Sequence, residues 1–244
     1  MSAPTPPSSR RIRSARGSLV VAIDGPAASG KSSTAQWVAQ RLGFRHVDSG
    51  ALYRAAAAVA IAHAGEEFDE AIVLGLLQEI SLRPAEHSFT PVWKGGEMEE
   101  MIRAPEVTRH VSRVAQMHGV RQWVNAHVRL AAEGRDVVVD GRDIGTVVFP
   151  DADLKVFLIA DPWERARRRL TQRHGRTASD AEIADETERL VQRDARDATQ
   201  TVQAKDAVLI DTTYLTQAEQ VERIVSLAGV FRGGGPGNGS ALRS

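Results

Sequence analysis

The chain contains no cysteine, which excludes disulfide bonds, zinc–thiolate sites and a cysteine nucleophile. It also has no excess charge of either sign, because 31 Lys and Arg residues balance 31 Asp and Glu residues. This balance gives no overall attraction to nucleic acid or to an anionic membrane. No stretch approaches the ~20 apolar residues that a helix needs to cross a bilayer. We therefore expect a soluble cytoplasmic protein, without a membrane or nucleic-acid partner.

The two ends of the chain have the composition of tails. Residues 1–18 are rich in Ser, Pro and Arg and contain no acidic residue. Organellar transit peptides share this composition, but the prolines disfavour an amphipathic helix, so we favour a flexible basic tail. Residues 231–244 are a glycine-rich segment of low complexity. We expect both segments to be disordered.

Between the tails, short apolar runs alternate with amphipathic stretches. The runs are typical of strands buried on both faces and lie at residues 19–24, 137–140, 154–160 and 207–211, with a weaker one at 44–48. The helical patterns cover residues 32–42, 52–64, 107–132, 162–173, 181–196 and 216–227. This alternation predicts an α/β fold with a parallel five-stranded sheet flanked by helices.

Two segments interrupt this alternation. Residues 81–99 form short alternating pieces around a Gly-Gly turn, which indicates a small sheet. We predict that residues 66–135 are an α+β insert in a core made of residues 19–65 and 136–230. The polar residues at about 171–185 are expected to form a lid over that core.

A phosphate-binding loop follows the first predicted strand. The sequence GPAASGKS matches G-x-x-x-x-G-K-[ST], and it lies between a predicted strand and a predicted helix. Glycines allow main-chain N–H groups to surround a phosphate, the lysine contacts the β- and γ-phosphates, and the serine can hold Mg²⁺. We assign to ATP binding Gly25, Pro26, Ala27, Ala28, Ser29, Gly30, Lys31, Ser32 and Ser33.

The strand at 137–140 ends in DGRD, which places Asp140, Arg142 and Asp143 at the edge of the sheet where ligands of α/β proteins bind. With Ser32, Asp140 is our candidate for holding Mg²⁺. The alternative is that Asp140 caps a helix or pairs with Arg142.

The sequence DSGALYR follows the weaker strand and supplies further anion-binding groups. Ser49 is expected at the N-cap of the next helix, with Tyr53 and Arg54 in its first turns. A hydroxyl, a phenol and a guanidinium near a helix N-terminus favour a second anion there. Simple capping beside a surface arginine is the alternative.

Arginines also follow the faces of the two predicted lid helices. Arg165 and Arg169 share one face with Arg168 beside them, and Arg193 and Arg196 lie on the second helix. One alternative is that they are solvated or paired with acids such as Glu188 and Asp194, and the other is that they close on a phosphate during transfer.

Six segments carry a resemblance to a known family, namely IDGPAASGKSS, DSGALYRA, IRAPEVTRHVS, DGRDIGTVVFPDADLKVFL, RDARD and DAVLIDTT. Together they resemble the bacterial cytidylate kinases, over about residues 19–230. DSGALYR and GRDIGTVVFPDA are specific to that family rather than to P-loop proteins at large. The resemblance implies transfer of phosphate from ATP to CMP or dCMP, and identifies the insert as the CMP-binding subdomain. It assigns to CMP Ser49, Tyr53, Arg54, Ser112, Arg121, Arg142, Asp143, Arg193 and Asp197.

Within this set, the resemblance implies that Ser112, Arg121 and Asp143 line the cytosine pocket. Lys31, Arg142 and Arg193 are the candidate catalytic residues, with Mg²⁺ as the cofactor and a monomer as the expected state.

One position departs from the family pattern. Gln200 stands where the family has an arginine, so one charged contact to CMP is weakened or supplied elsewhere. Other small-molecule kinases of this architecture, for AMP, UMP or shikimate, are the nearest alternatives. A nucleic-acid-linked ATPase is a more distant one, and its basic tail would include Arg10–Arg16.

Overall fold

The computed structural model describes residues 17–232. The expected tails, residues 1–18 and 231–244, therefore lie outside the described residues except at their inner ends. None of the described helices is long and apolar enough to span a bilayer.

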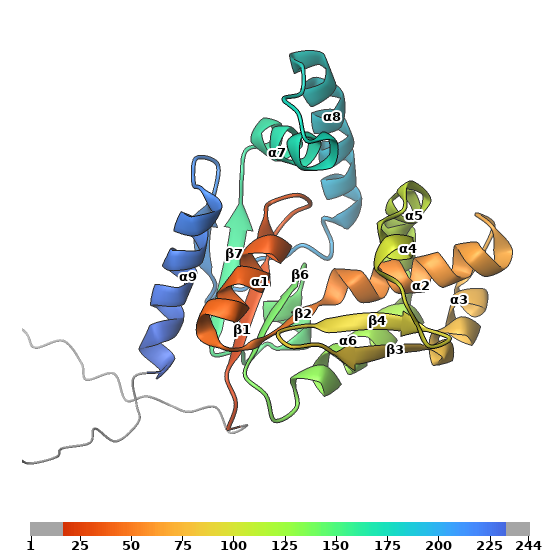
Figure 1. The fold of residues 1–244 in the computed structure, drawn as a ribbon, viewed down its shortest axis with the longest axis horizontal. Coiled ribbons are helices and arrows are strands. Elements are labelled where there is room, and N and C mark those ends of the chain that lie inside the picture. Colours follow the sequence, from red (N-terminus) through yellow and green to blue (C-terminus); the bar gives the residue numbers. More distant parts are fainter. Residues whose placement is uncertain (1–16, 233–244) are drawn as a thin grey trace, which may run out of the picture.

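The centre of the molecule is a five-stranded parallel sheet with strand order β2-β6-β1-β7-β8 (Figure 1). Its strands are β1 (Val20–Asp24), β2 (Arg45–Asp48), β6 (Val137–Gly141), β7 (Leu154–Ile159) and β8 (Val208–Asp211). All five runs predicted as strands of the core are confirmed. β1 and β6 are buried along their whole length, as their uninterrupted apolar sequences predict.

Helices cover both faces of the sheet. α1 (Lys31–Leu42) and α9 (Gln217–Arg232) pack on one face, which buries Val21, Ile23 and Val138. α2 (Ser49–Ala64) and α6 (His118–Ala132) pack on the other, over Val20 and Ala22. Because successive strand residues point to opposite faces, one short apolar run supplies both cores.

The region between α2 and β6 contains the second sheet, with strand order β3-β4-β5. The helices and strands of this region are α3 (Glu70–Leu76), the short helix η1 (Leu77–Glu79), β3 (Ile80–Pro84), β4 (Phe89–Trp93), β5 (Gly96–Glu97), α4 (Glu99–Arg103), α5 (Pro105–Gln116) and α6. Its apolar residues belong to the same core cluster as α2 and the main sheet. The insert therefore has no separate core.

The amphipathic pattern at 107–132 corresponds to two helices, because the chain breaks at Met117, which has extended backbone angles. Gly119, in the first turn of α6, donates its N–H to Glu70 Oε1 at 2.5 Å. A Cβ at Gly119 would lie 3.0 Å from the Leu74 side chain. The glycine thus lets α6 start close against α3, and this tertiary contact is not visible in the amphipathic pattern.

Two antiparallel helices, α7 (Pro162–His174) and α8 (Asp180–Asp197), stand above the carboxyl edge of the sheet (Figure 1). The predicted lid range covers only the turn of this helical hairpin and the adjoining helix ends. Ser179 and Glu182 form a capping box that fixes the start of α8. A small apolar cluster joins both helices to Ala27 of the phosphate loop.

Candidate active site

The phosphate loop connects the end of β1 at Asp24 to the start of α1 at Lys31. Gly25 has φ of 153°, and a Cβ there would lie 2.3 Å from the Leu158 carbonyl oxygen. Gly30 has φ of 86°. Ala28 also has a positive φ, 58°, which is uncommon for a residue with a side chain. The first and last glycines of the motif are therefore required by the path of the main chain.

Lys31 is buried at the start of α1, and its Nζ donates to the Pro26 carbonyl oxygen at 3.0 Å. Burial lowers the pKa of Lys31 to about 7, and the nearby positive charge of Arg142 adds to this effect. A buried ammonium group beside a guanidinium is strongly stabilised when an anion binds next to it. Lys31 thus lies in surroundings that favour phosphate binding.

Asp140 lies at the end of β6 and is nearly inaccessible to solvent. Its Oδ2 accepts from Ser32 Oγ at 2.5 Å, and its Oδ1 lies 2.7 Å from His46 Nε2. Burial raises the pKa of Asp140, but His46, Ser32 and Lys31 outweigh it, so the net shift is downward. Burial and the charge of Asp140 raise the pKa of Asp48. Of the two sequence-based alternatives for Asp140, neither the helix cap nor the Arg142 pair is present.

The residues around Asp140 fit a magnesium ion better than a metal bound by protein alone. Residues 17–232 contain no group of three or more His, Cys, Asp or Glu side chains that could hold a metal. Mg²⁺ is usually held by one or two protein oxygens together with phosphates and water. The adjacent Ser32 hydroxyl and Asp140 carboxylate are a donor set of this kind.

The N-cap of α2 is Asp48, which accepts from the Ala51 N–H at 3.0 Å, so the prediction of Ser49 as N-cap is wrong. Ser49 is the first helical residue, and its hydroxyl instead donates to the Asp140 carbonyl oxygen at 2.8 Å. The aspartate precedes the serine and competes for the same N–H groups. Tyr53 and Arg54 lie in the next turn, and the Tyr53 hydroxyl is buried without a hydrogen-bond partner.

Arg121 of α6 and Asp143, just after β6, form an ion pair. Burial raises the pKa of Asp143, although the charge of Arg121 acts in the opposite direction. Ser112 of α5 is buried in the wall of the same cleft. The insert and the core therefore meet at these three side chains, which come from α5, α6 and the segment just after β6.

Asp197, at the end of α8, lies between two arginines. Its Oδ2 is 3.7 Å from Arg142 Nη2 and 3.7 Å from Arg193 Nε. Burial lowers the pKa of Arg193 to about 10, and the charge of Arg142 adds to this effect. Two partly buried guanidinium groups share this carboxylate. The wall of the cleft as a whole has six Lys and Arg side chains against four Asp side chains, so it has an excess of positive charge.

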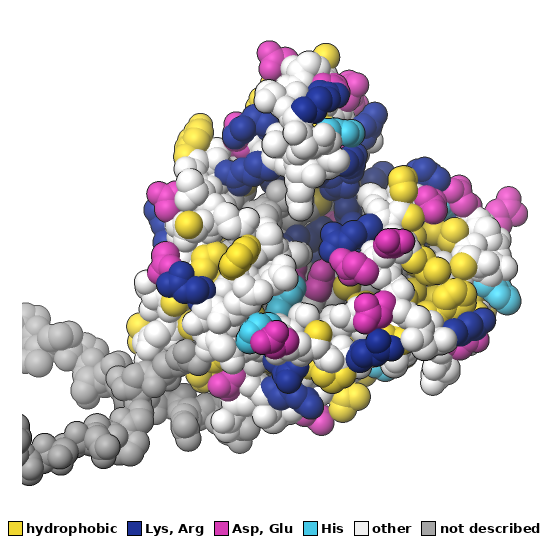
Figure 2. Space-filling model, viewed as in Figure 1, with side chains coloured by type: hydrophobic (Ala, Val, Ile, Leu, Met, Phe, Trp, Pro, Cys, Tyr) yellow, Lys and Arg dark blue, Asp and Glu magenta, His cyan; other side chains and the backbone are white. Residues whose placement is uncertain are grey.

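These residues line one cleft between the core, the insert and the lid, and Figure 2 shows Lys and Arg side chains gathered around this hollow. Predicted residues in its wall are Ala27, Ala28, Lys31, Ser32, Ser49, Tyr53, Arg54, Ser112, Arg121, Asp140, Arg142, Asp143, Arg193 and Asp197. Gly25, Pro26, Ser29, Gly30 and Ser33 are not in the wall, although all of them belong to the phosphate loop or the first turn of α1.

The structure places Arg169 and Gln200 in the wall, beside the predicted residues. Arg169 Nε also lies 3.0 Å from Glu186 Oε1. Helical periodicity did not distinguish Arg169 from its neighbours on α7. The sequence offered no reason to place His46 against Asp140, because no histidine had metal-ligand spacing.

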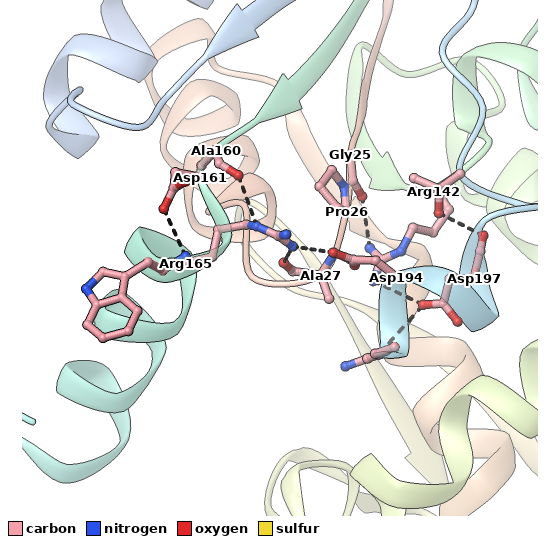
Figure 3. Close-up of polar contacts among 12 residues, drawn as sticks. Gly25, Pro26, Ala27, Arg142, Ala160, Asp161, Arg165, Asp194 and Asp197 are labelled. Atoms are coloured by element: carbon pink, nitrogen blue, oxygen red, sulfur yellow. Dashed lines mark hydrogen bonds and ion pairs between the residues drawn. The ribbon is translucent and has the colours of Figure 1, made fainter. Parts of the chain in front are cut away.

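The other lid arginines have structural partners. Arg165 Nη1 donates to the Ala27 carbonyl oxygen at 2.8 Å and to Asp194 Oδ2 at 2.6 Å, as Figure 3 shows. Asp194 Oδ1 in turn accepts from the Ala27 N–H at 3.1 Å. Arg168 donates to the carbonyl oxygens of Thr212 and Thr213. Arg165 therefore pairs with an acid, as one alternative predicted, whereas Arg168 bonds to main-chain carbonyl oxygens, which neither alternative predicted.

Comparisons with known proteins agree with this architecture. The family profile described as "Cytidylate kinase" matches residues 21–229. Cytidylate kinases of Geobacillus kaustophilus and Solibacter usitatus are each 41% identical to this chain over 86% of its length, covering 96% and 91% of theirs. A bifunctional pantoate ligase/cytidylate kinase of a Synechococcus strain is 43% identical over 91% of this chain, which spans 42% of that relative. The match extends across the phosphate loop, the insert and the lid, and the chain belongs to the cytidylate kinase family.

Proposed function

We propose that the cleft transfers the γ-phosphate of ATP to CMP or dCMP, with the donor phosphates on the loop at 25–32 and the acceptor between the insert and Arg142. The observation that supports this most directly is a set of buried polar atoms without hydrogen-bond partners. Within residues 17–232 these are Ser29 Oγ, Tyr53 Oη, Arg142 Nε and Arg193 Nε. Such atoms are costly unless a ligand satisfies them, and all four belong to the proposed site.

On the acceptor side, Tyr53, Arg54, Arg142 and Arg193 hold the phosphate of CMP. The two buried arginines present donors to an anion that brings its own charge into the cleft. Gln200 carries no charge, and Arg169 lies in the same wall. Arg169 therefore supplies the positive charge that the family places at position 200.

The base is recognised at the junction of insert and core. Asp143 accepts from the cytosine amino group, while Arg121 and Ser112 donate to the ring nitrogen and carbonyl oxygen. Uracil would place a carbonyl oxygen against the carboxylate. In a desolvated pocket this mismatch is expected to cost on the order of a hundredfold in kcat/KM.

Catalysis by these residues requires no general base, because the attacking oxygen of the CMP phosphate is already ionised at neutral pH. The chain positions two anions in line and neutralises the charge that spreads during transfer. Lys31, Arg142 and Arg193 supply positive charge from three sides. Magnesium, when bound through Ser32 and Asp140, supplies further positive charge at the β- and γ-phosphates.

The test is CDP formation by the purified protein with ATP and magnesium, compared across CMP, dCMP, UMP, AMP and shikimate. We expect CMP and dCMP to be the preferred acceptors. Lys31→Ala should lower kcat by about a hundredfold or more while the protein remains folded. Lys94→Ala, which removes an exposed lysine of the insert, is the control and should keep normal activity. No CDP from the wild-type protein would overturn the proposal, and ATP hydrolysis stimulated by RNA but not by CMP would replace it.

A further inference from the structure

His46 is a buried histidine to which the proposed reaction assigns no role. In the parallel pairing of β2 with β6, His46 is opposite Val138 and Asp48 is opposite Asp140. Because side chains alternate along a strand, His46, Asp48 and Asp140 point to the same face of the sheet. That face is the one covered by α1, whose first turn carries Ser32. The sheet register therefore places the imidazole directly beside the carboxylate.

The two oxygens of Asp140 have different partners. Oδ1 lies 2.7 Å from His46 Nε2, and Oδ2 lies 2.5 Å from Ser32 Oγ. An ionised carboxylate only accepts hydrogen bonds, so His46 Nε2 carries the proton and donates it to Oδ1. With Oδ1 engaged, the carboxylate plane is fixed, and Oδ2 faces the start of α1 and the phosphate loop.

The main chain of His46 is held as firmly as its side chain. Its N–H donates to the His87 carbonyl oxygen at 2.8 Å, and the imidazole is largely buried. Neighbouring Arg45 donates to the Ala85 carbonyl oxygen. These contacts restrict the part of β2 that carries the imidazole, which supports its role as a well-positioned donor to Asp140.

We propose that His46 is a positioning residue that orients Asp140, so that Oδ2 and the Ser32 hydroxyl together hold the magnesium ion of the nucleotide. This inference rests on the proposed function, in which Asp140 and Ser32 are the magnesium-binding pair. Partners that orient a ligating carboxylate typically change metal affinity or activity by about 10- to 100-fold when removed. The role is specific to magnesium, so nucleotide binding without metal should not depend on it.

The experiment compares the wild-type protein with His46→Leu, His46→Gln and His87→Leu. Leucine removes the donor, whereas the glutamine amide can place an N–H near the position of Nε2. His87→Leu makes the same change at a half-exposed histidine of the adjoining loop. ADP binding is measured by titration calorimetry with and without Mg²⁺ at constant pH, and CDP formation is measured as a function of free Mg²⁺.

We expect His46→Leu to raise the Mg²⁺ concentration for half-maximal activity by about 10-fold or more. The same variant should lose most of the gain in ADP affinity that Mg²⁺ gives the wild type, and ADP affinity without Mg²⁺ should be unchanged. His46→Gln should restore the Mg²⁺ dependence to within about threefold of wild type, because it keeps a donor. His87→Leu should behave as wild type.

Several results would overturn the inference. One is an unchanged Mg²⁺ dependence in His46→Leu, and another is an equal loss of ADP affinity with and without Mg²⁺. If the leucine variant does not fold, His46→Asn serves instead, because its shorter amide falls short of Oδ1, and normal Mg²⁺ dependence there would be equally adverse. A wild-type protein that makes no CDP but binds ADP more tightly with Mg²⁺ would refute the proposed function. The calorimetric comparison of the His46 variants would then still test the role of His46.

Discussion

At the scale of single residues, the site depends on polar side chains that are buried. Asp143 is the clearest case for specificity, since its carboxylate is buried and its ion-pair partner, Arg121, comes from the insert. Asp24 is the clearest case for stability. It is 4% exposed and accepts from the Ile144 N–H at 2.9 Å and the Gly145 N–H at 2.8 Å. A substitution at each of these two residues tests its role separately.

We predict that Asp143→Ala relaxes base selection. Loss of the carboxylate removes the acceptor for the cytosine amino group and the repulsion of the uracil carbonyl. The CMP/UMP ratio of kcat/KM should fall by about a hundredfold. Asp185→Ala, at an exposed position of α8, should leave this ratio unchanged. An unaltered ratio in Asp143→Ala would remove this residue from the base pocket.

We also predict a pH-dependent contribution of Asp24 to stability. Burial raises the pKa of Asp24 from 3.8 to about 6. A buried carboxyl with a raised pKa binds its proton more tightly in the folded state, so its contribution to stability falls as pH rises from about 4 to 6. Denaturant unfolding of wild type and Asp24→Asn at pH 4.5 and 7.5 measures this contribution. The asparagine variant should gain about 2 kcal/mol relative to wild type between these two pH values.

The asparagine side chain does not titrate, so its own contribution is the same at both pH values and cancels in this comparison. A difference between the two proteins that does not change with pH would show that Asp24 titrates normally in the folded state.

At the scale of elements, the lid is joined to the phosphate loop by hydrogen bonds. Asp194 of α8 accepts from the Ala27 N–H, and Arg165 of α7 bonds both Asp194 and the Ala27 carbonyl oxygen (Figure 3). Arg193 and Asp197, on the same helix as Asp194, reach the cleft. The hydrogen bonds of Asp194 therefore fix the position of α8, and with it the position of Arg193 and Asp197 in the cleft wall.

Arg165→Leu should lower the free energy of unfolding by about 3 kcal/mol, because it leaves Asp194 and the Ala27 carbonyl oxygen without their buried partner. Arg167→Leu makes the same change two positions along α7, where the ion pair with Glu164 is exposed. That control should change stability by no more than about 0.5 kcal/mol. Urea denaturation of both variants gives the comparison, and equal effects would contradict a structural anchor at Arg165.

At the scale of the whole molecule, three parts of the chain surround one cleft in which Lys and Arg side chains outnumber carboxylates. The core supplies Lys31 and Arg142, the insert supplies Arg121, and the lid supplies Arg193. A ligand that contacts all three parts should stabilise the folded state by mass action.

CMP at 100 times its dissociation constant should therefore raise stability by about 2.7 kcal/mol. For a domain of this size this corresponds to an increase in Tm of roughly 5–10 °C. Differential scanning fluorimetry measures the shift, with UMP at the same concentration as the matched ligand. A UMP shift as large as that of CMP would contradict recognition of the base by Asp143 and Arg121.

The sequence predicted the features that depend on neighbouring residues or on repeating patterns. The phosphate loop is contiguous, and its glycines are required by local main-chain geometry, so the motif alone located it. The five strands were visible because strands buried on both faces are apolar at every position. The family resemblance then supplied the candidate residues for the acceptor, and the structure gathers those candidates in one cleft.

What only the tertiary structure decided is which partner each polar side chain has across the fold. Arg165, Arg168 and Arg169 have the same helical context, yet two bond to the main chain of the core and the third lines the cleft. His46 contacts Asp140 because of the register between two strands far apart in the chain. The break at Met117 follows from close packing of α6 on α3. Composition and periodicity determine that a residue is buried or exposed, but the energy of a buried polar group depends on the partner it meets, and only the folded chain supplies that partner.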